Sequence, residues 1–457
     1  MEHSSPQNSN KFGNWFKTSI TARMLMVGFL VLILLIPLAF IDNLILERSH
    51  RQDEVVDEIN DKWGSDVLVY GPMVKLPYKT YSETKTYHEP TKTYIKEIQT
   101  HINYAYIFPE ELAVDTKVTS KSLKRNNYES AVFTTNMSFS GQFSQIDLLK
   151  KDIKNEDIIW DKAKLLIKTS NLKGIKNEII ASINDHPYPF ETIADNSNEY
   201  SGSLDGLETS FLTEKDFSKE LITSFKLEMN FNGSKSIKII PVGKTTKMSM
   251  TSNWANPSFT GNYLPDDETK EITPQGFKAN WKILHINRPF SQEYLNKVPV
   301  LKKFAFGTDF IVLVDQYQKS QRSSKYGFLV IGLTFLIFFL IQTLSKISIH
   351  PFQYLMIGLA LTMFYTLLIS ISEHSTFLKA YLIAGISVIG LITLYSKTIL
   401  KSTKFSIFIG LSLTLLYTFI YVIIQLENYA LLVGSIGLFL ILASVMFISR
   451  KIDWNHD

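Results

Sequence analysis

The sequence predicts a membrane protein of the α+β class, with six transmembrane helices and a large antiparallel β-sandwich-like domain inserted between helix 1 and helix 2. Three observations lead to this fold class. Six stretches are long and apolar enough to cross a bilayer, the first and second of them are separated by residues 42–325, and that segment is polar with repeated two-residue alternation. At 457 residues the chain is long enough for both a helix bundle and an independent domain.

The six spans follow from the length of their apolar runs. A helix needs roughly 20 mostly apolar residues to cross a hydrocarbon core of about 30 Å, because in lipid only the helix itself satisfies its backbone. The windows that meet this length are 24–41, 326–344, 352–371, 377–395, 405–424 and 429–448. Lys379, near one end of its window, is the only Lys, Arg, Asp or Glu inside them, and its long stem can reach the interface.

The first window has two interpretations, because a basic N-terminal region followed by an apolar run also describes a cleaved signal peptide. The apolar run is longer than a typical signal sequence, and Ile41, Asp42 and Asn43 after it offer no small-x-small cleavage site. We therefore expect an uncleaved anchor, with removal as the alternative.

The orientation is predicted from the basic residues of the short loops, which are retained in the cytoplasm. One side of the predicted bundle carries Lys346, Lys397, Lys401, Lys404, Arg450 and Lys451. The opposite short loops carry Glu373 and Glu427. This places residues 1–23 and the tail 449–457 in the cytoplasm and residues 42–325 in the periplasm.

The sequence pattern of the inserted segment predicts many short β-strands. Alternation of apolar and polar residues predicts strands at 128–143, 163–169, 225–231, 236–242, 245–252 and 277–286. Turn signals such as Asn232-Gly233 separate them, and few helical patterns interrupt them. An antiparallel sandwich is the expected arrangement. Before it, Leu44–Trp63 is charged with apolar residues at helical spacing, so helix 1 is expected to continue outward as a stalk.

Several local strings, in order along the chain, are similar to one known family. They are Gly71-Pro72-Met73-Val74, Trp254-Ala255-Asn256-Pro257-Ser258-Phe259, Gly276-Phe277-Lys278-Ala279-Asn280-Trp281, Arg322-Ser323-Ser324-Lys325-Tyr326-Gly327, His350-Pro351-Phe352-Gln353-Tyr354 and Ser370-Ile371-Ser372-Glu373-His374. From about Gln52 to the last helix the chain resembles the CreD family of bacterial inner-membrane proteins.

The resemblance implies an inner-membrane location and a part in cell envelope integrity, but it supplies no catalytic residues to carry over. One position departs from the family pattern. Asn171 stands where the family tends to have Asp, so any role of that carboxylate is in doubt for this chain.

Signatures of enzymes are absent from the sequence. There is no cysteine, which excludes disulfides and thiolate chemistry, and there is no Gly-rich phosphate loop, His-Glu-x-x-His or Gly-x-Ser-x-Gly motif. The nine histidines lack metal-ligand spacing. We predict no catalytic, cofactor-binding or metal-binding residues, and a net charge of +4 without a basic stripe argues against nucleic-acid binding.

Two groups of residues are candidates for a lipid, ion or partner site. Glu373 and His374 fall at the outer end of the third predicted helix, where they could relay a proton, bind a cation or seat a lipid headgroup. The alternative is that they only solvate a tight helix hairpin. Arg322, Lys325 and Tyr326 mark the return of the chain into the outer leaflet, where anchoring to phosphate headgroups is expected.

The sequence favours a non-enzymatic envelope protein whose outer domain binds an envelope protein or wall component. Membrane lipids and a second copy are further expected partners, because small residues four apart, such as Ala380 and Ala384, permit close helix packing. A transporter or lipid-handling protein is the first alternative, although the spans offer chiefly hydroxyls. An enzyme acting on envelope sugars is the second, resting on the plentiful carboxylates of the outer domain.

Overall fold

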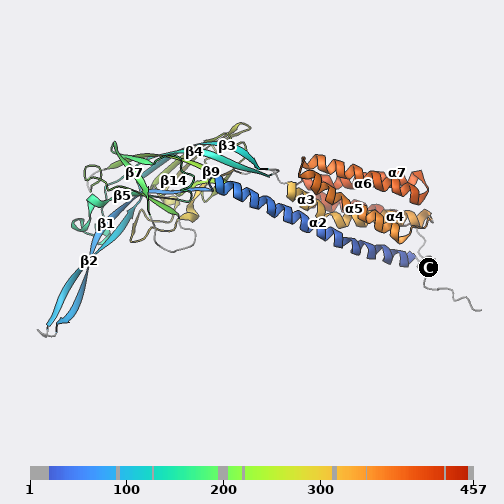
Figure 1. Cartoon of the computed structure of the whole chain (residues 1–457), viewed down its shortest axis with the longest axis horizontal. Coiled ribbons are helices and arrows are strands. Elements are labelled where there is room, and N and C mark those ends of the chain that lie inside the picture. The colour runs from blue at the N-terminus through green and yellow to red at the C-terminus, as the bar shows by residue number, and fades with distance from the viewer. Residues whose placement is uncertain are drawn as a thin grey trace, which may run out of the picture. The chain divides into compact units, whose positions relative to one another are not determined.

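The chain forms two compact units in the computed structural model (Figure 1). The membrane unit comprises Met1–Asp53 and Val314–Asp457, and the β-rich unit comprises Glu54–Leu313. The structure describes residues 20–88, 93–125, 128–193, 204–218, 222–310, 316–345, 347–426 and 429–450. Lys346, Glu427 and Lys451, which entered the prediction of topology, lie outside these ranges, as do the termini 1–19 and 451–457.

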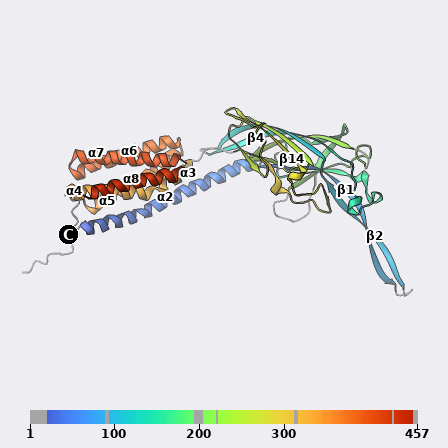
Figure 2. The ribbon, with the colours of Figure 1, turned by 180° about the vertical axis from the view of Figure 1, so that it is seen from behind.

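The six predicted spans are confirmed as helices long and apolar enough to cross a membrane. They are α2 (Ile20–Trp63), α4 (Gly327–Ser345), α5 (Pro351–Ser372), α6 (Phe377–Leu400), α7 (Thr403–Gln425) and α8 (Ala430–Ser449), seen from both sides in Figures 1 and 2. The predicted helical continuation of the first span is also confirmed, because α2 runs without a break to Trp63.

Helix α2 packs on the bundle through one stripe of side chains. Its buried residues recur every three or four positions: Val27, Leu30, Leu34, Leu38, Ile41 and Ile45. Two of these side chains, Leu34 and Leu38, pack directly against glycines of the bundle. A Cβ atom added at Gly358 of α5 would lie 2.0 Å from Leu34 Cδ1, and one at Gly327 would lie 2.6 Å from Leu38 Cδ1. The anchor helix is therefore held by side chains that fit into spaces left by glycine.

A short helix, α3 (Gln316–Lys325), precedes α4 and contacts α4, α5, α6 and α7. Its sequence has no apolar periodicity that would predict it. The buried face is made instead of Ser320, Ser323 and Ser324, whose small side chains allow a close approach to the bundle.

The β-rich unit contains sixteen strands among its described residues. They are β1 (Val67–His88), β2 (Thr93–Ile107), β3 (Glu111–Arg125), β4 (Tyr128–Phe143), β5 (Lys164–Thr169), β6 (Ile180–Ile183), β7 (His186–Thr192), β8 (Asp205–Thr209), β9 (Thr223–Ser234), β10 (Ser236–Ile239), β11 (Thr245–Ser252), β12 (Pro257–Gly261), β13 (Glu271–Thr273), β14 (Gly276–Leu284), β15 (Glu293–Leu295) and β16 (Phe306–Phe310). All six predicted strands are present, as β4, β5, β9, β10, β11 and β14.

The sheet is mixed, which corrects the expected antiparallel sandwich. One hydrogen-bonded path runs β12-β16-β10-β1-β5-β8-β7-β6-β9-β4-β3-β11-β14-β13. Along it β1 pairs with β10, and β3 with β11, in parallel. Alternation reports which face of a strand is buried but not the direction of its neighbour. Parallel pairing needs only a long connection, and each of these pairs joins strands far apart in the chain.

An aromatic core joins strands from opposite ends of this path. Phe310 of β16 packs against Phe133 of β4, with ring centroids 4.9 Å apart, and Phe306 packs against Trp281 of β14 at 5.7 Å. Trp281 is 3% exposed. Together with Phe259, it belongs to this core.

The outer halves of β1 and β2 form a hairpin that projects from the rest of the β-rich unit (Figure 1). The pairing of β1 with β5 ends at Lys75, and that of β2 with β15 ends at Ala105. Beyond Tyr78, the described strand residues pair only between β1 and β2. Two-stranded hairpins are marginally stable alone in water. This arm is therefore the part of the unit most in need of an external contact.

Candidate functional site

Glu373 and His374 lie at the end of α5, as the sequence predicts, but they differ in their surroundings. Glu373 caps α5 and forms an ion pair with Arg48 of α2, with 3.6 Å between Arg48 Nε and Glu373 Oε1. His374 is exposed, and its side chain forms no hydrogen bond or ion pair with any described residue. The carboxylate thus pairs with α2 across the bundle, while the imidazole has no polar partner among the described residues.

Arg322, Lys325 and Tyr326 lie at the junction of α3 and α4, near the same end of α5. Lys319, Arg322 and Lys325 give α3 three positive charges and no negative one. None of the three forms an ion pair within the part of the chain that the structure describes. A short helix with a buried serine face and basic residues elsewhere suits the surface of an anionic bilayer.

Polar contacts fasten α3 to its neighbours. Ser324 Oγ donates a hydrogen bond to the Asp42 carboxylate of α2. The Gln316 amide, oriented to satisfy its surroundings, donates to the backbone carbonyls of Ser372 and Ser375 at 2.6 and 3.2 Å. Sequence reasoning missed this cluster because its partners lie far apart in the chain.

The projecting hairpin carries its exposed large apolar side chains on one face. Lys79 lies opposite Ile102, Tyr81 opposite Thr100 and Glu83 opposite Ile98, so these six residues share that face. Ile98 is 66% exposed and Ile102 is 55% exposed. The other face is polar, with Thr80, Ser82, Thr84, Glu97, Gln99 and His101. Exposed apolar residues in a row on a soluble surface commonly mark an interaction site.

A groove of about 510 Å³ with both apolar and polar lining residues crosses β3, β4, β11 and β14. It is lined by hydroxyls, an amide, two lysines and the carboxylates of Asp115 and Asp266. Trp281 also borders it, but its ring is buried in the core and cannot stack on a ligand. The groove can hydrogen-bond a polar molecule, and it lacks an aromatic platform.

One histidine is brought to a buried carboxylate. His186 Nδ1 lies 2.7 Å from Asp216 Oδ1, while Tyr188 and Thr213 donate to Asp216 Oδ2 at 2.5 and 2.7 Å. Burial would raise the pKa of Asp216, but the hydrogen bonds from Tyr188, Thr213 and His186 outweigh it and lower that pKa. The imidazole is largely exposed. No spacing in the sequence signals this pair, because thirty residues separate its members.

His350 has a structural role. His350 caps α5: its Nδ1 accepts a hydrogen bond from the Phe352 amide at 3.2 Å, and its own amide donates to Gln353 Oε1 at 2.9 Å. In the described residues, no group of three or more His, Asp or Glu is placed to hold a metal ion.

Both the NH₂ group and the oxygen of the Asn171 side-chain amide form hydrogen bonds. Its Nδ2 donates to the Asn232 carbonyl at 2.9 Å, and its Oδ1 accepts from the Gly174 amide at 2.8 Å. Asn171 is buried, and a carboxylate there would have no hydrogen to give Asn232. The departure from the family pattern is thus matched by a local structural role of the amide.

The fold defines a multi-pass membrane protein with a large β-rich domain inserted after its first span. A family model described as inner membrane protein CreD matches residues 19–455. The chain is also 31% identical over 438 residues to inner membrane protein CreD of Escherichia coli (strain K12), which covers 93% of this chain and 91% of the relative. The chain belongs to the CreD family of inner membrane proteins, as the resemblance of its motifs predicted.

Proposed function

We propose that this inner-membrane protein contributes to cell envelope integrity without catalysing a reaction, and that its β-rich unit binds an envelope protein or wall component in the periplasm. The observation that carries the proposal is the row of exposed Tyr81, Ile98 and Ile102 on one face of the hairpin. Covering these side chains with a partner would remove apolar area from water at roughly 25 cal/mol per Å². It would also stabilise a two-stranded hairpin, which is only marginally stable by itself in water.

The test compares two adjacent residues of β2 that point to opposite faces. Ile98→Asp replaces one of these exposed apolar side chains with a charge, and Gln99→Asp places the same charge on the opposite face. In a strain lacking the gene, we expect the unchanged chain and Gln99→Asp to restore resistance to detergents and large antibiotics, and Ile98→Asp to restore much less at equal protein level.

A second measurement separates the hairpin from the broader proposal. A photo-crosslinking amino acid at Thr100, on the same face as Ile98 and Ile102, should give a discrete adduct in cells that disappears with Ile98→Asp and persists with Gln99→Asp. Equal restoration by all chains would remove the hairpin from the proposal. Failure of the unchanged chain to alter envelope resistance would remove the role in integrity itself.

The same proposal places both termini in the cytoplasm. Thr376, in the turn before α6, and Thr403, at the start of α7, are both exposed and stand at opposite ends of α6. Because the natural chain has no cysteine, Thr376→Cys and Thr403→Cys each create a single thiol. We expect a membrane-impermeant maleimide to label Thr376→Cys in intact spheroplasts and Thr403→Cys only after permeabilisation. The reverse pattern would contradict the orientation.

We further propose that α3 meets the membrane surface on the periplasmic side, with Arg322 and Lys325 against phosphate headgroups and Tyr326 at the interface. Three uncompensated positive charges on ten residues support this placement. His374, exposed beside the Arg48–Glu373 pair, is the ligand-facing group of this end of the bundle.

A further inference from the structure

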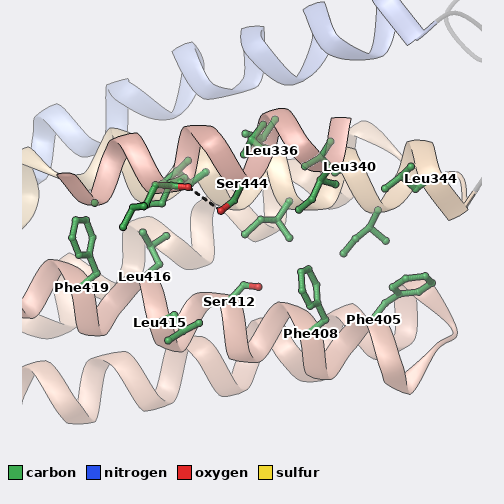
Figure 3. Close-up of a pocket in the computed structure, with 18 of the residues that line it drawn as sticks. Leu336, Leu340, Leu344, Phe405, Phe408, Ser412, Leu415, Leu416, Phe419 and Ser444 are labelled. Carbon is green, nitrogen blue, oxygen red and sulfur yellow. Dashed lines mark hydrogen bonds between the residues drawn. The ribbon is translucent and has the colours of Figure 1, made fainter. Parts of the chain in front are cut away.

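A deep groove runs along the membrane unit between α4, α7 and α8 (Figure 3). Its volume is about 880 Å³, within the range of small-molecule sites. Leu336, Leu340 and Leu344 border it on α4, and Phe405, Phe408 and Ser412 border it on α7. The side chains that line it are apolar apart from Lys404, Ser412 and Ser444. The Ser444 hydroxyl donates to the Leu440 carbonyl of its own helix at 2.8 Å.

The groove exists because α8 approaches the bundle closely at one place. A Cβ atom at Gly437 would lie 2.1 Å from Phe419 Cζ, so this glycine lets α8 rest against the aromatic ring of α7. None of the twenty residues of α8, all of which the structure describes, is buried. From Gly437 toward the end of α8, the space between α8 and α4 is the groove.

The groove is shorter than the hydrocarbon core is thick. Its lining covers about 16 Å of α4 (Leu333 to Leu344), about 16 Å of α8 (Gly437 to Ile448) and about 22 Å of α7 (Lys404 to Phe419). A full hydrocarbon core is about 30 Å thick. A transmembrane helix from a second chain would need the whole core, so the groove fits an extended acyl chain better than a helix.

One end of the groove is positively charged. Lys404 lines it there, and Lys397, Lys401 and Arg450 are exposed at the same ends of α6, α7 and α8. The described carboxylates of the membrane unit are Asp42, Glu47, Asp53 and Glu373. They lie on α2 and at the end of α5, and none of them lines the groove. An ammonium group at the membrane surface pairs with a phosphate as a point charge.

We propose that this groove binds one acyl chain of an anionic phospholipid, with Lys404 against the headgroup phosphate. The apolar walls replace the contacts of neighbouring lipid tails, and the terminal lysine selects a negative headgroup. The site is independent of the hairpin and of the role proposed for the β-rich unit. It predicts a lipid held by the protein, and it involves no transport step.

The experiment uses the full-length chain in nanodiscs of phosphatidylcholine that contain a small fraction of phosphatidylglycerol with a photoactivatable acyl chain. Adducts are mapped by mass spectrometry. We expect them to concentrate on the lining segments of α7 and α8. Ser412→Trp, which fills the groove, should remove most of them, and Thr414→Trp, at an exposed position of the same helix outside the groove, should not.

The headgroup is tested with a second matched pair. Lys404→Glu should reduce the adducts about fivefold or more, since one lysine next to an anionic lipid changes binding by about that factor. Lys397→Glu, exposed at the same end but outside the lining, should have a smaller effect. Photoactivatable phosphatidylcholine should label the groove weakly.

Three results would overturn the proposal. Labelling spread evenly over all lipid-facing helices would show only bulk lipid, equal labelling by both headgroups would remove the selection by Lys404, and crosslinks between protein chains at the groove would identify a second copy as the occupant. Ser444→Trp on α8 fills the groove from its other wall, so it repeats the test if Ser412→Trp does not yield folded protein.

Discussion

Replacing Asp216 by Asn is expected to destabilise the β-rich unit by roughly 3 kcal/mol at neutral pH, because a buried acceptor of several hydrogen bonds is lost. The carboxylate accepts from His186, Tyr188 and Thr213 with two oxygens. The Asn side chain keeps one acceptor oxygen, but its NH₂ group can only donate and would face donors in place of the second oxygen. The side chain is 4% exposed, so water cannot easily replace the missing acceptor.

The effect should depend on pH in a defined direction. Hydrogen bonding lowers the pKa of Asp216 in the folded chain below its ordinary value of about 3.9. A carboxyl group whose pKa is lowered by folding stabilises the fold above its unfolded pKa, and this contribution is lost as the pH falls through the folded pKa. The difference between the natural chain and Asp216→Asn should therefore be full at pH 7 and shrink below about pH 4.

Urea unfolding of the full chain in detergent micelles, at pH 7 and near pH 3, measures both effects. Asp185→Asn is the matched control: it changes an exposed carboxylate in the neighbouring turn, at a φ of 68° that Asn also tolerates. It should shift stability by less than about 0.5 kcal/mol. Equal effects of the two substitutions, or a pH-independent effect of Asp216→Asn, would contradict the role given to the buried carboxylate.

The spans could be predicted from the sequence because the bilayer imposes their length and composition. Strands with one exposed face could be predicted for a similar reason, since water on one side leaves an alternating pattern, as in β9 and β11. The first half of β1 shows no alternating pattern. Residues Val67–Val74 are buried without interruption, so that stretch reads as an apolar run of no defined period.

The candidate site was predictable only where a single residue carries the signal. Glu373 and His374 stand out as ionisable residues between two apolar runs, but Arg48, which pairs with Glu373, lies on another helix far away in the chain. The His186–Asp216 pair and the parallel pairing of strands could not be predicted for the same reason. Each depends on which distant segments meet, and neither local propensity nor periodicity contains that information.

The intramembrane groove was beyond prediction for a further physical reason. Lipid-facing and groove-facing residues of α4, α7 and α8 are both apolar, so hydropathy cannot separate them. Glycines are the informative residues in such a bundle, because they mark where another side chain comes close. Gly437 fixes the approach of α8, and Gly358 fixes that of α2.

Gly358→Leu is therefore expected to weaken the attachment of α2 to the bundle, at a cost of about 1–3 kcal/mol for overpacking. Already its Cβ atom would lie 2.0 Å from Leu34 Cδ1 and 2.9 Å from Phe335 Cζ. Leu34 is fully buried and lies in the middle of the α2 stripe, so it has little room to move away. The detergent-solubilised chain should lose its monodisperse form at a temperature several degrees lower.

Gly332→Leu in α4 is the control, because a Cβ atom there meets nothing within 4 Å. It should leave thermal stability unchanged or slightly raised, since leucine favours a helix more than glycine does. Combining Gly358→Leu with Leu34→Ala should recover part of the loss, because the smaller residue on α2 returns the space that leucine takes on α5. If the double variant is no more stable than Gly358→Leu alone, the fit of Leu34 into the glycine space is not what holds α2, and the Arg48–Glu373 and Asp42–Ser324 contacts would have to carry that attachment.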